Sequence, residues 1–491
     1  MGISYGEPLG LAYVAGSIET SARHQVEVLD AMGLAEEFEQ QGTNIVYGLS
    51  HDEVVQRMRR TSFDAIGITI TKMYEDDDQI LRLIALIKKE FPKIPVIIGG
   101  PDVSLEWATY MALDTVDYAV LGEGETTIVQ LLDHLEGRGA LKDMHGICYR
   151  EEGKVKMIQQ GPAVEIDKIP WPARHLFPME NYFKNKPLGV RRRSAAILTS
   201  RACPYSCAFC STIEVWGRKW RGRTAKDVVD EIEHLVKHFG VGEIVVFDDN
   251  FLVDTKRVEA IADDIVARKL DIEFRVSPGL MIHLLNVDLL KKLRKAGLST
   301  VQMQLESGNK KTLEYIDKHI DISKAKDIVT AAHSFGLRVY TNVLLGFFFE
   351  DRSDIEESIR VAESIGFDGV DYMLAEPKPK TRMYDDFVKA GIFKDGEVPV
   401  MPVDTLHFKG RELAAILKAA QQNQMRVRSR RFFQLQTWTG YLIPKYVLNP
   451  SNTLGRMQGI ALAAADKARR FLRDLVRSEK PALKPVFNRN C

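Results

Sequence analysis

The chain has 491 residues, with 67 basic side chains (Lys and Arg) balanced by 67 acidic ones. That length exceeds the roughly 250–300 residues at which a single hydrophobic core stops growing, so two or three domains are expected. Charge balance gives no electrostatic case for nucleic acid, and five cysteines, three of them on one loop, form no disulfide framework. No apolar run approaches the ~20 residues of a membrane span, so we expect a cytoplasmic protein.

Residues 1–135 alternate short apolar runs with helical patterns and are predicted to form one α/β domain. Strands are expected at residues 26–30, 65–70, 95–100 and 119–121. An amphipathic helix is expected over residues 77–91. The alternation predicts a flavodoxin-like parallel sheet covered on both faces. Glycines at the strand ends let backbone approach a ligand closely, or they simply form tight turns.

Residues 136–194 are predicted to be a linker that contains a hairpin. The segments 146–150 and 151–155 are typical of paired strands around a turn at Glu152-Gly153. Five prolines between residues 162 and 187 then indicate extended chain. Cys148, inside the hairpin, is expected to be a small buried residue.

Residues 195–395 continue the β/α alternation and are predicted to form a second domain. Strands are expected at residues 195–199, 243–247, 272–277, 300–305, 337–345 and 369–374. Helices are expected at residues 224–239, 255–267, 287–296, 310–316, 323–335 and 354–365. Right-handed crossovers place such strands in one parallel sheet. Six units predict a partial (β/α)6 TIM-type barrel with its active face at the carboxyl ends of the strands.

Cys203, Cys207 and Cys210 lie on the loop that follows the first of these strands. Thiolates are soft ligands that select zinc, copper(I) or iron–sulfur clusters. A closed structural zinc site needs four ligands and this loop offers three, whereas three thiolates suit a cubane cluster whose fourth iron stays open. The alternatives are a zinc site completed by a distant His and three incidental thiols without a metal.

Residues 396–491 are predicted to form a helical C-terminal region. Helices are expected at 411–424 and 454–476, and the second is rich in Lys and Arg. Basic amphipathic helices usually expose their charges to water and pack the other face. The alternative is peripheral contact with a membrane surface or with an apolar substrate.

The spacing Cys-x-x-x-Cys-x-aromatic-Cys resembles the signature of the radical S-adenosylmethionine (SAM) enzymes. In that family a 4Fe–4S cluster binds SAM at its open iron and cleaves it reductively to a 5′-deoxyadenosyl radical. The resemblance implies that Cys203, Cys207 and Cys210 hold the cluster and that Phe209 lies against the adenine.

Motifs at later strand ends resemble the SAM-binding segments of the same family. Asp248 and Asp249 match the motif that receives the amino group of SAM, and carboxylates beside a cationic ligand are electrostatically favourable. Glu306 and Ser307 match the segment that binds the SAM ribose and carboxylate. Gly346 ends the fifth strand, where the family has a turn near the adenine.

The N-terminal domain resembles the cobalamin-binding domain that precedes many radical SAM domains, through residues 7–13, 97–101 and 122–125. The resemblance implies a corrinoid contacted by Leu9, Gly10, Thr69, Gly99, Gly100, Gly122, Glu123 and Gly124. The usual first strand is missing, so a short N-terminus is expected. The Asp-x-His-x-x-Gly signature of cobalt ligation is absent, so backbone and shape would hold the corrinoid. A retained but empty domain is the alternative.

Together these motifs resemble the cobalamin-dependent radical SAM methyltransferases, and they imply an enzyme with three cofactors: a 4Fe–4S cluster, SAM and cobalamin. We expect methylation of an unactivated carbon of an apolar substrate, either a polycyclic lipid of the hopanoid kind or a tetrapyrrole. That class is indicated by the basic, aromatic tail and by Phe347–Phe349. A flavodoxin, ferredoxin or reductase would donate electrons. The alternatives are a radical SAM oxidase or cyclase of the same build and a non-catalytic corrinoid or cluster carrier.

Overall fold

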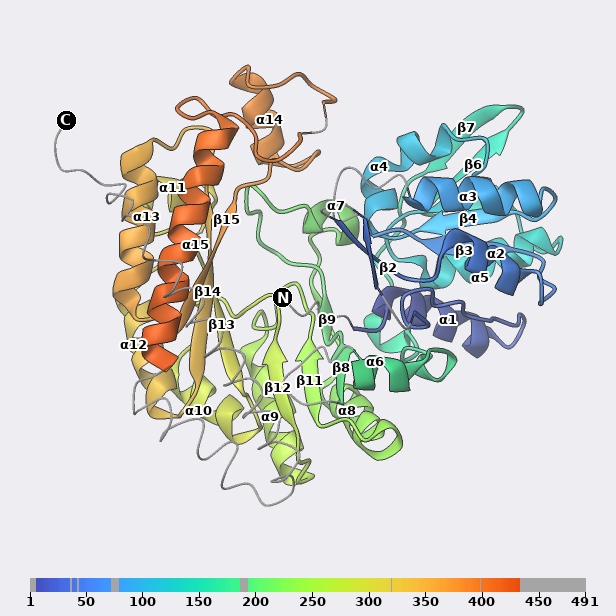
Figure 1. The fold of residues 1–491 in the computed structure, drawn as a ribbon. Coiled ribbons are helices and arrows are strands. Elements are labelled where there is room, and N and C mark those ends of the chain that lie inside the picture. Colours follow the sequence, from blue (N-terminus) through green and yellow to red (C-terminus); the bar gives the residue numbers. More distant parts are fainter. Residues whose placement is uncertain are drawn as a thin grey trace. The chain divides into compact units, whose positions relative to one another are not determined.

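The computed structural model describes residues 6–35, 38–41, 44–71, 79–185, 193–318, 320–397 and 399–432. The chain forms two compact units, Met1–Gln424 and Met425–Cys491. The first unit carries both α/β domains (Figure 1). Of the expected C-terminal helices, the first is present as α15 (Gly410–Phe432). The second, at residues 454–476, lies outside the described residues.

The N-terminal domain is built on a five-stranded sheet of order β3-β4-β5-β6-β7. Its strands are β3 (Ile66–Thr69), β4 (Val96–Gly99), β5 (Tyr118–Val120), β6 (Ile147–Glu151) and β7 (Lys154–Ile158). Its helices are α1 (Leu9–Ser21), α2 (His51–Met58), α3 (Gln79–Glu90), α4 (Pro101–Met111) and α5 (Gly124–Leu135). Strands β3, β4 and β5 are parallel, so their carboxyl ends meet at one edge.

Helices cover both faces of this sheet, as the alternation of the sequence predicts. Successive residues of a strand point to opposite faces, and Ile97 and Ile98 of β4 belong to different cores. Ile98 packs with Ile84 of α3 and Met111 of α4. Ile97 packs with Leu131 of α5. The flavodoxin-like fold class is confirmed.

The N-terminal domain differs from the sequence-based expectation in two places. The strand expected at residues 26–30 is wrong, because this segment is extended chain without a ladder partner among the described residues. Its side chains serve tertiary contacts instead: the Asp30 carboxylate accepts hydrogen bonds from the Gly33 amide at 2.8 Å and the Tyr182 hydroxyl at 2.6 Å. A short antiparallel pair that was not predicted, β1 (Phe38–Gln41) with β2 (Asn44–Tyr47), follows.

The hairpin of β6 and β7 is confirmed, and it continues the N-terminal sheet. Glu152 and Gly153 have φ values of 50° and 75°, the left-handed pair that a two-residue type I′ turn requires. β6 pairs antiparallel with β5, with Ala119 opposite Cys148. A short 3-10 turn, Leu141–Asp143, precedes β6. After β7, two more 3-10 turns, Ile166–Lys168 and Arg174–Leu176, and the helix α6 (Met179–Asn185) lead to the second domain.

The second domain is a parallel barrel of six strands within the described residues, in chain order. The strands are β8 (Ser194–Ile197), β11 (Glu243–Val246), β12 (Glu273–Val276), β13 (Thr300–Glu306), β14 (Arg338–Leu345) and β15 (Gly369–Leu374). β8, β11 and β12 form one ladder, and β13, β14 and β15 form another. Parallel bridges Phe274–Leu298 and Leu280–Met303 join them. The predicted partial (β/α)6 barrel is confirmed.

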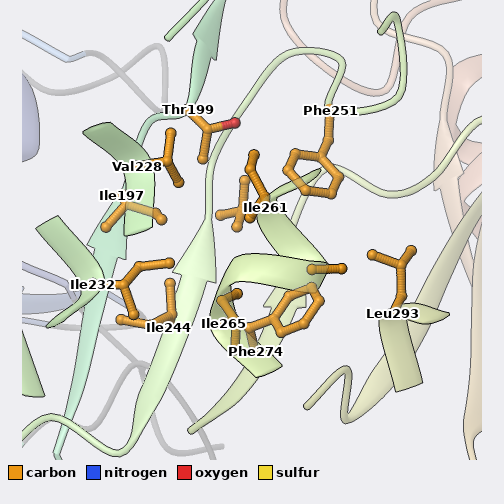
Figure 2. A pocket seen from close by; sticks show the side chains of 12 residues that line it. Ile197, Thr199, Val228, Ile232, Ile244, Phe251, Ile261, Ile265, Phe274 and Leu293 are labelled. Atoms are coloured by element: carbon orange, nitrogen blue, oxygen red, sulfur yellow. The ribbon is translucent and has the colours of Figure 1, made fainter. Parts of the chain in front are cut away.

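Helices pack against one face of these strands and bury a continuous aliphatic layer. They are α8 (Ala225–Phe239), α9 (Thr255–Ala267), α10 (Val287–Lys295), α12 (Ile322–Ser334) and α13 (Arg352–Ile365). The short helix α11 (Lys310–Tyr315) packs instead with the aromatic residues that follow β14. Figure 2 shows this layer, where Ile197, Ile244 and Phe274 of the strands meet Ile232 and Ile265 of the helices. Asp254 caps α9, because its side chain accepts a hydrogen bond from the Arg257 amide at 3.0 Å.

Short elements complete the carboxyl-end side of the barrel. They are β9 (Ser200–Arg201), α7 (Thr212–Trp216), β10 (Arg221–Gly222) and α14 (Arg382–Lys389). β9 and β10 form an antiparallel ribbon beside the cysteine loop. Among the described residues, no helix combines the length and apolarity that crossing a bilayer requires.

Candidate functional site

The three cysteines lie on a loop between β9 and α7, beyond the carboxyl end of β8. None is in a disulfide, and all three are partly exposed. The Cys210 amide donates to the Cys207 carbonyl at 3.0 Å, which places both thiols on one turn. Ala202, which precedes Cys203, has a φ of 68°, a left-handed conformation that costs energy for a residue with a Cβ and is typical of functional loops.

The donor set fits an iron–sulfur cluster with three protein ligands. Among the described residues, no group of three or more His, Cys, Asp or Glu is arranged to hold a single metal ion. In a cubane each thiolate binds a different iron, which a loop of spaced thiols can satisfy. Burial raises the pKa of Cys207 to about 11, and the Lys318 ammonium opposes that rise. Metal binding, which needs the thiolate, therefore releases a proton there.

Asp248 braces the base of the cysteine loop. It is fully buried, and its carboxylate accepts hydrogen bonds from the Thr199 amide at 2.6 Å, the Thr199 hydroxyl at 2.5 Å and the Ser200 hydroxyl at 2.6 Å. Burial raises its pKa, while Arg257 and these donors oppose the rise. With both oxygens engaged, Asp248 is suited to fixing the end of β8, and its expected role at the SAM amino group stays a prediction.

Asp249, the neighbouring residue, is directed at the cysteine loop. It accepts from the Thr212 hydroxyl at 3.3 Å, and burial raises its pKa to about 6. Asn250, which we did not single out from the sequence, donates to Met281 Sδ at 2.7 Å and approaches Cys203 Sγ at 3.8 Å. Its place directly after the acidic pair was the available signal.

A buried cation accompanies Glu306 at the end of β13. Lys318 Nζ donates to Glu306 Oε1 at 2.7 Å and lies 3.4 Å from Gln304 Oε1. The Lys318 and Glu306 side chains are only 7% and 12% exposed. Glu306 has a φ of 62° and interrupts the register with β14, so local strain is concentrated at this strand end. Lys318 was missed because it follows a short helix rather than a strand.

Ser307, by contrast, faces the helical layer. It is fully buried, and its hydroxyl is 2.8 Å from the Ser358 hydroxyl of α13 and accepts from the Asn309 amide at 3.1 Å. A Cβ on Gly308 would lie 2.6 Å from the Val361 side chain. The structure therefore gives Ser307 a packing contact, and its expected contact with SAM stays a prediction.

Gly346 ends β14 in a turn that a buried carboxylate closes. Its φ is 87°, and a Cβ there would meet Leu413 at 3.1 Å. Glu350 accepts from the Gly346 amide at 2.8 Å, the Phe347 amide at 3.1 Å and the Thr312 hydroxyl at 2.8 Å. Burial raises the pKa of Glu350 to about 7.

The aromatic residues after this turn form a core. Phe347 is fully buried, and its ring lies 5.9 Å from that of Tyr315. Phe349 lies 4.9 Å from the same Tyr315 ring. Phe209 packs at the edge of this aromatic cluster, with the Lys318 ammonium 6.0 Å from its ring. Phe209 is thus placed beside both the cysteine turn and the Glu306–Lys318 pair.

The predicted cobalamin residues end β3 and β4, follow β4 and β5, or begin α1. Thr69 and Gly10 are exposed, and a Cβ on Gly10 would meet nothing within 4 Å. Leu9, which precedes Gly10, and Gly99, at the end of β4, are partly buried. This edge, with glycine where backbone is open, fits a ligand held by backbone and shape.

Other glycines at that edge have structural reasons. A Cβ on Gly100 would lie 2.4 Å from the Ile70 carbonyl, and one on Gly122 would lie 2.6 Å from the Gln160 side chain. Gly124 begins α5, where a Cβ would touch Val120 at 3.3 Å. Gly100 and Gly122 have φ values of 117° and 69°, so the turns account for glycine at these two positions, and the expected contact of all three glycines with cobalamin stays a prediction.

Glu123, expected to contact cobalamin, is paired with arginines of the second domain. Arg221 contacts both of its carboxylate oxygens, and Arg201 donates to Oε2 at 3.1 Å. Arg201 also donates to Glu125 Oε1 at 2.5 Å. The Glu123 carboxylate therefore forms ion pairs between the two domains.

Comparison with known proteins agrees with both halves of this arrangement. Residues 197–362 match the radical SAM superfamily, and residues 4–132 match the B12 binding domain. Radical SAM domains use a 4Fe–4S cluster with SAM, and B12 binding domains use cobalamin. These are the three cofactors that the sequence predicts.

Similar proteins include several methyltransferases. "Uncharacterized methyltransferase PH0819" from Pyrococcus horikoshii is 30% identical over 423 residues, 84% of this chain and 87% of that protein. Cytidylyl-2-hydroxyethylphosphonate methyltransferase from Streptomyces wedmorensis is 28% identical over 79% of each chain. The structure of the radical SAM methyltransferase TsrM from Kitasatospora setae matches with a TM-score of 0.64 at 16% identity, over 81% of this chain and 78% of that one. The chain belongs to the radical SAM superfamily, in the group of methyltransferases that carry a B12 binding domain.

Proposed function

We propose that this enzyme methylates an unactivated carbon of its substrate. The observation that carries the proposal is the loop of three free thiols at the barrel's carboxyl ends, in a chain that also has a B12 binding domain. When bound, the cluster with SAM supplies a radical that abstracts hydrogen, and cobalamin supplies a methyl group.

The chain's own residues hold and orient these groups. We infer that Cys203, Cys207 and Cys210 ligate the cluster. The Asn250 side-chain amide helps to position the Cys203 sulfur. Asp248 sets the base of the loop through Thr199 and Ser200, so its substitution should misplace the thiols.

For SAM, the partly exposed Asp249 is the better candidate of the acidic pair for the amino group, because its oxygens are less fully engaged. Glu306 and Lys318 together offer opposite charges beside Phe209. An ammonium can pair with the carboxylate of the ligand and a glutamate can accept from hydroxyl groups, so this pair suits the two ends of an amino-acid-linked ribose.

The strand face opposite the helices supports a proposal for the substrate class. On β13, Val301, Met303 and Leu305 are buried against the helical layer, so the alternating Gln302 and Gln304 face the other way and are partly exposed. Gln302 donates to Asn342 of β14 at 3.0 Å. Hydrogen-bonding side chains therefore line this face in its middle.

Apolar side chains lie nearer the carboxyl ends of the same face. Phe247, after β11, and Met373 of β15 are 38% and 42% exposed. By strand alternation they lie on the face of Gln302 and Gln304. This distribution supports a substrate whose reacting carbon is apolar and whose other end carries hydrogen-bonding groups.

The narrower prediction of a polycyclic lipid or tetrapyrrole is supported by similar proteins rather than by described side chains. Phe347 and Phe349 belong to a packed core, and the basic tail lies outside the described residues. Similar proteins support both substrates: a hopanoid C-3 methylase from Methylococcus capsulatus is 23% identical, and an anaerobic magnesium-protoporphyrin IX monomethyl ester cyclase from Rubrivivax gelatinosus is 26% identical.

The test is anaerobic reconstitution with iron, sulfide and cobalamin, followed by dithionite and SAM carrying a deuterated methyl group. The expected result is 5′-deoxyadenosine and, with cell extract as substrate source, a product that gains the labelled methyl group. A product that loses two hydrogens without label would indicate an oxidase or cyclase instead. Absence of 5′-deoxyadenosine from a protein with a full cluster would indicate a carrier and refute the proposal.

A further inference from the structure

Two arginines stand opposite each other on the ribbon that leads into the cysteine loop. Arg201 of β9 and Arg221 of β10 are directly paired in the antiparallel register. Their side chains are only 3% and 9% exposed. Buried guanidinium groups need compensating charge. Among the described residues of the barrel, neither arginine forms an ion pair with a carboxylate.

The compensating charges come from the B12 binding domain. Arg201 bridges two carboxylates, donating to Glu123 Oε2 at 3.1 Å and to Glu125 Oε1 at 2.5 Å. Arg221 grips both oxygens of Glu123 and donates to the Val164 carbonyl at 2.7 Å. Such forked contacts fix direction as well as distance. We call these four residues the arginine clamp.

The residues of the arginine clamp are close in sequence to both regions where cofactors are expected to bind. Glu123 lies in the turn after β5 and Glu125 lies in the first turn of α5, at the sheet edge where cobalamin is expected. Arg201 is two residues before Cys203, and its guanidinium lies 5.2 Å from the ring of Trp216, in the helix that follows the cysteine loop. A shift of the turn is therefore transmitted to both ends of the cysteine loop.

We propose that Arg201 is a positioning residue which, through Glu123 and Glu125, fixes the cluster loop relative to the corrinoid-binding edge. Radical abstraction and methyl delivery must reach the same substrate carbon from two cofactors, and a displacement of about 1 Å can lower such a rate about 100-fold. The arginine clamp keeps the cysteine loop in a fixed position relative to the corrinoid-binding edge, as this reaction requires.

The test measures the distance between the reduced cluster and cob(II)alamin by pulsed electron paramagnetic resonance of the reconstituted holoenzyme, so no substrate is needed. Wild-type protein is expected to give one narrow distance distribution. In Arg201→Gln that distribution should broaden or shift, and SAM should alter the cluster spectrum less than in wild type. An unchanged distribution in a variant that retains both cofactors would overturn the proposal.

Two further variants separate positioning from folding. Arg201→Gln combined with Glu125→Gln removes two buried charges together, so neither is left unpaired; thermal stability should recover while the broad distribution persists. Arg268→Gln breaks ion pairs to Asp230 and Asp264 within the barrel and should leave the distribution as in wild type. A narrow distribution in the double variant, or a broad one in Arg268→Gln, would also overturn the assignment.

Discussion

Replacing Glu350 with Gln should make the folded protein more stable at alkaline pH and remove one source of its pH dependence. Glu350 is fully buried in the turn after β14, and burial raises its pKa from 4.5 to about 7. A carboxyl group whose pKa is higher in the folded than in the unfolded state binds its proton more tightly when folded. The folded state is therefore penalised above pH 7 and relieved as the pH falls toward 4.5.

The size of the penalty follows from the pKa. At 1.36 kcal/mol per pH unit, a rise from 4.5 to about 7 corresponds to about 3 kcal/mol at pH 8.5. Gln can keep the local contacts, because its carbonyl accepts from the Gly346 and Phe347 amides while its NH₂ group donates to the Thr312 hydroxyl. The expected gain at pH 8.5 is up to about 3 kcal/mol, falling below about 1 kcal/mol at pH 5.

Urea unfolding of the apo protein at pH 5, 7 and 8.5 measures this difference. Glu314→Gln, the same substitution at an exposed position of the nearby helix α11, serves as the matched control and should give no pH-dependent difference. The reasoning is refuted if Glu350→Gln and wild type differ by the same free energy at all three pH values, or if the variant is less stable at pH 8.5.

The other predictions concern the cluster and the scaffold. Cys207→Ala should abolish iron incorporation on reconstitution, whereas Cys148→Ala should not, because Cys148 is buried in the N-terminal sheet; iron and sulfide analysis decides, and a full cluster in the Cys207 variant would reject the ligand assignment. Ile244→Ala should lower the free energy of unfolding by about 2–5 kcal/mol, since Ile244 is fully buried between the strands and α8; a loss near zero in urea unfolding contradicts that packing. Asp254→Ala should cost about 1 kcal/mol by removing the cap of α9, while Asp254→Asn should retain most of it.

Hydrophobic periodicity predicted helices and strands correctly where the burial of side chains is regular. In the barrel every strand has one side against the helices, so apolar residues recur at the spacing that predicts both elements, and α9 begins and ends at the predicted residues. The same pattern predicted a strand at residues 26–30 that does not form, although the apolar run there is equally clear. Those side chains pack against two different cores, and nothing in a local pattern distinguishes that from pairing in a sheet.

The sequence by itself determined the order of the elements, the three-thiol loop and the two domains, because these depend on spacing along the chain. Only the tertiary structure decided which charged groups are engaged. Asp248 and Asp249 are adjacent and chemically identical, yet one is closed off by Thr199 and Ser200 while the other reaches the cysteine loop. The pairing of Arg201 with Glu123 spans 78 residues. Burial and partners arise from elements distant in sequence, and they fix the protonation and availability of each side chain.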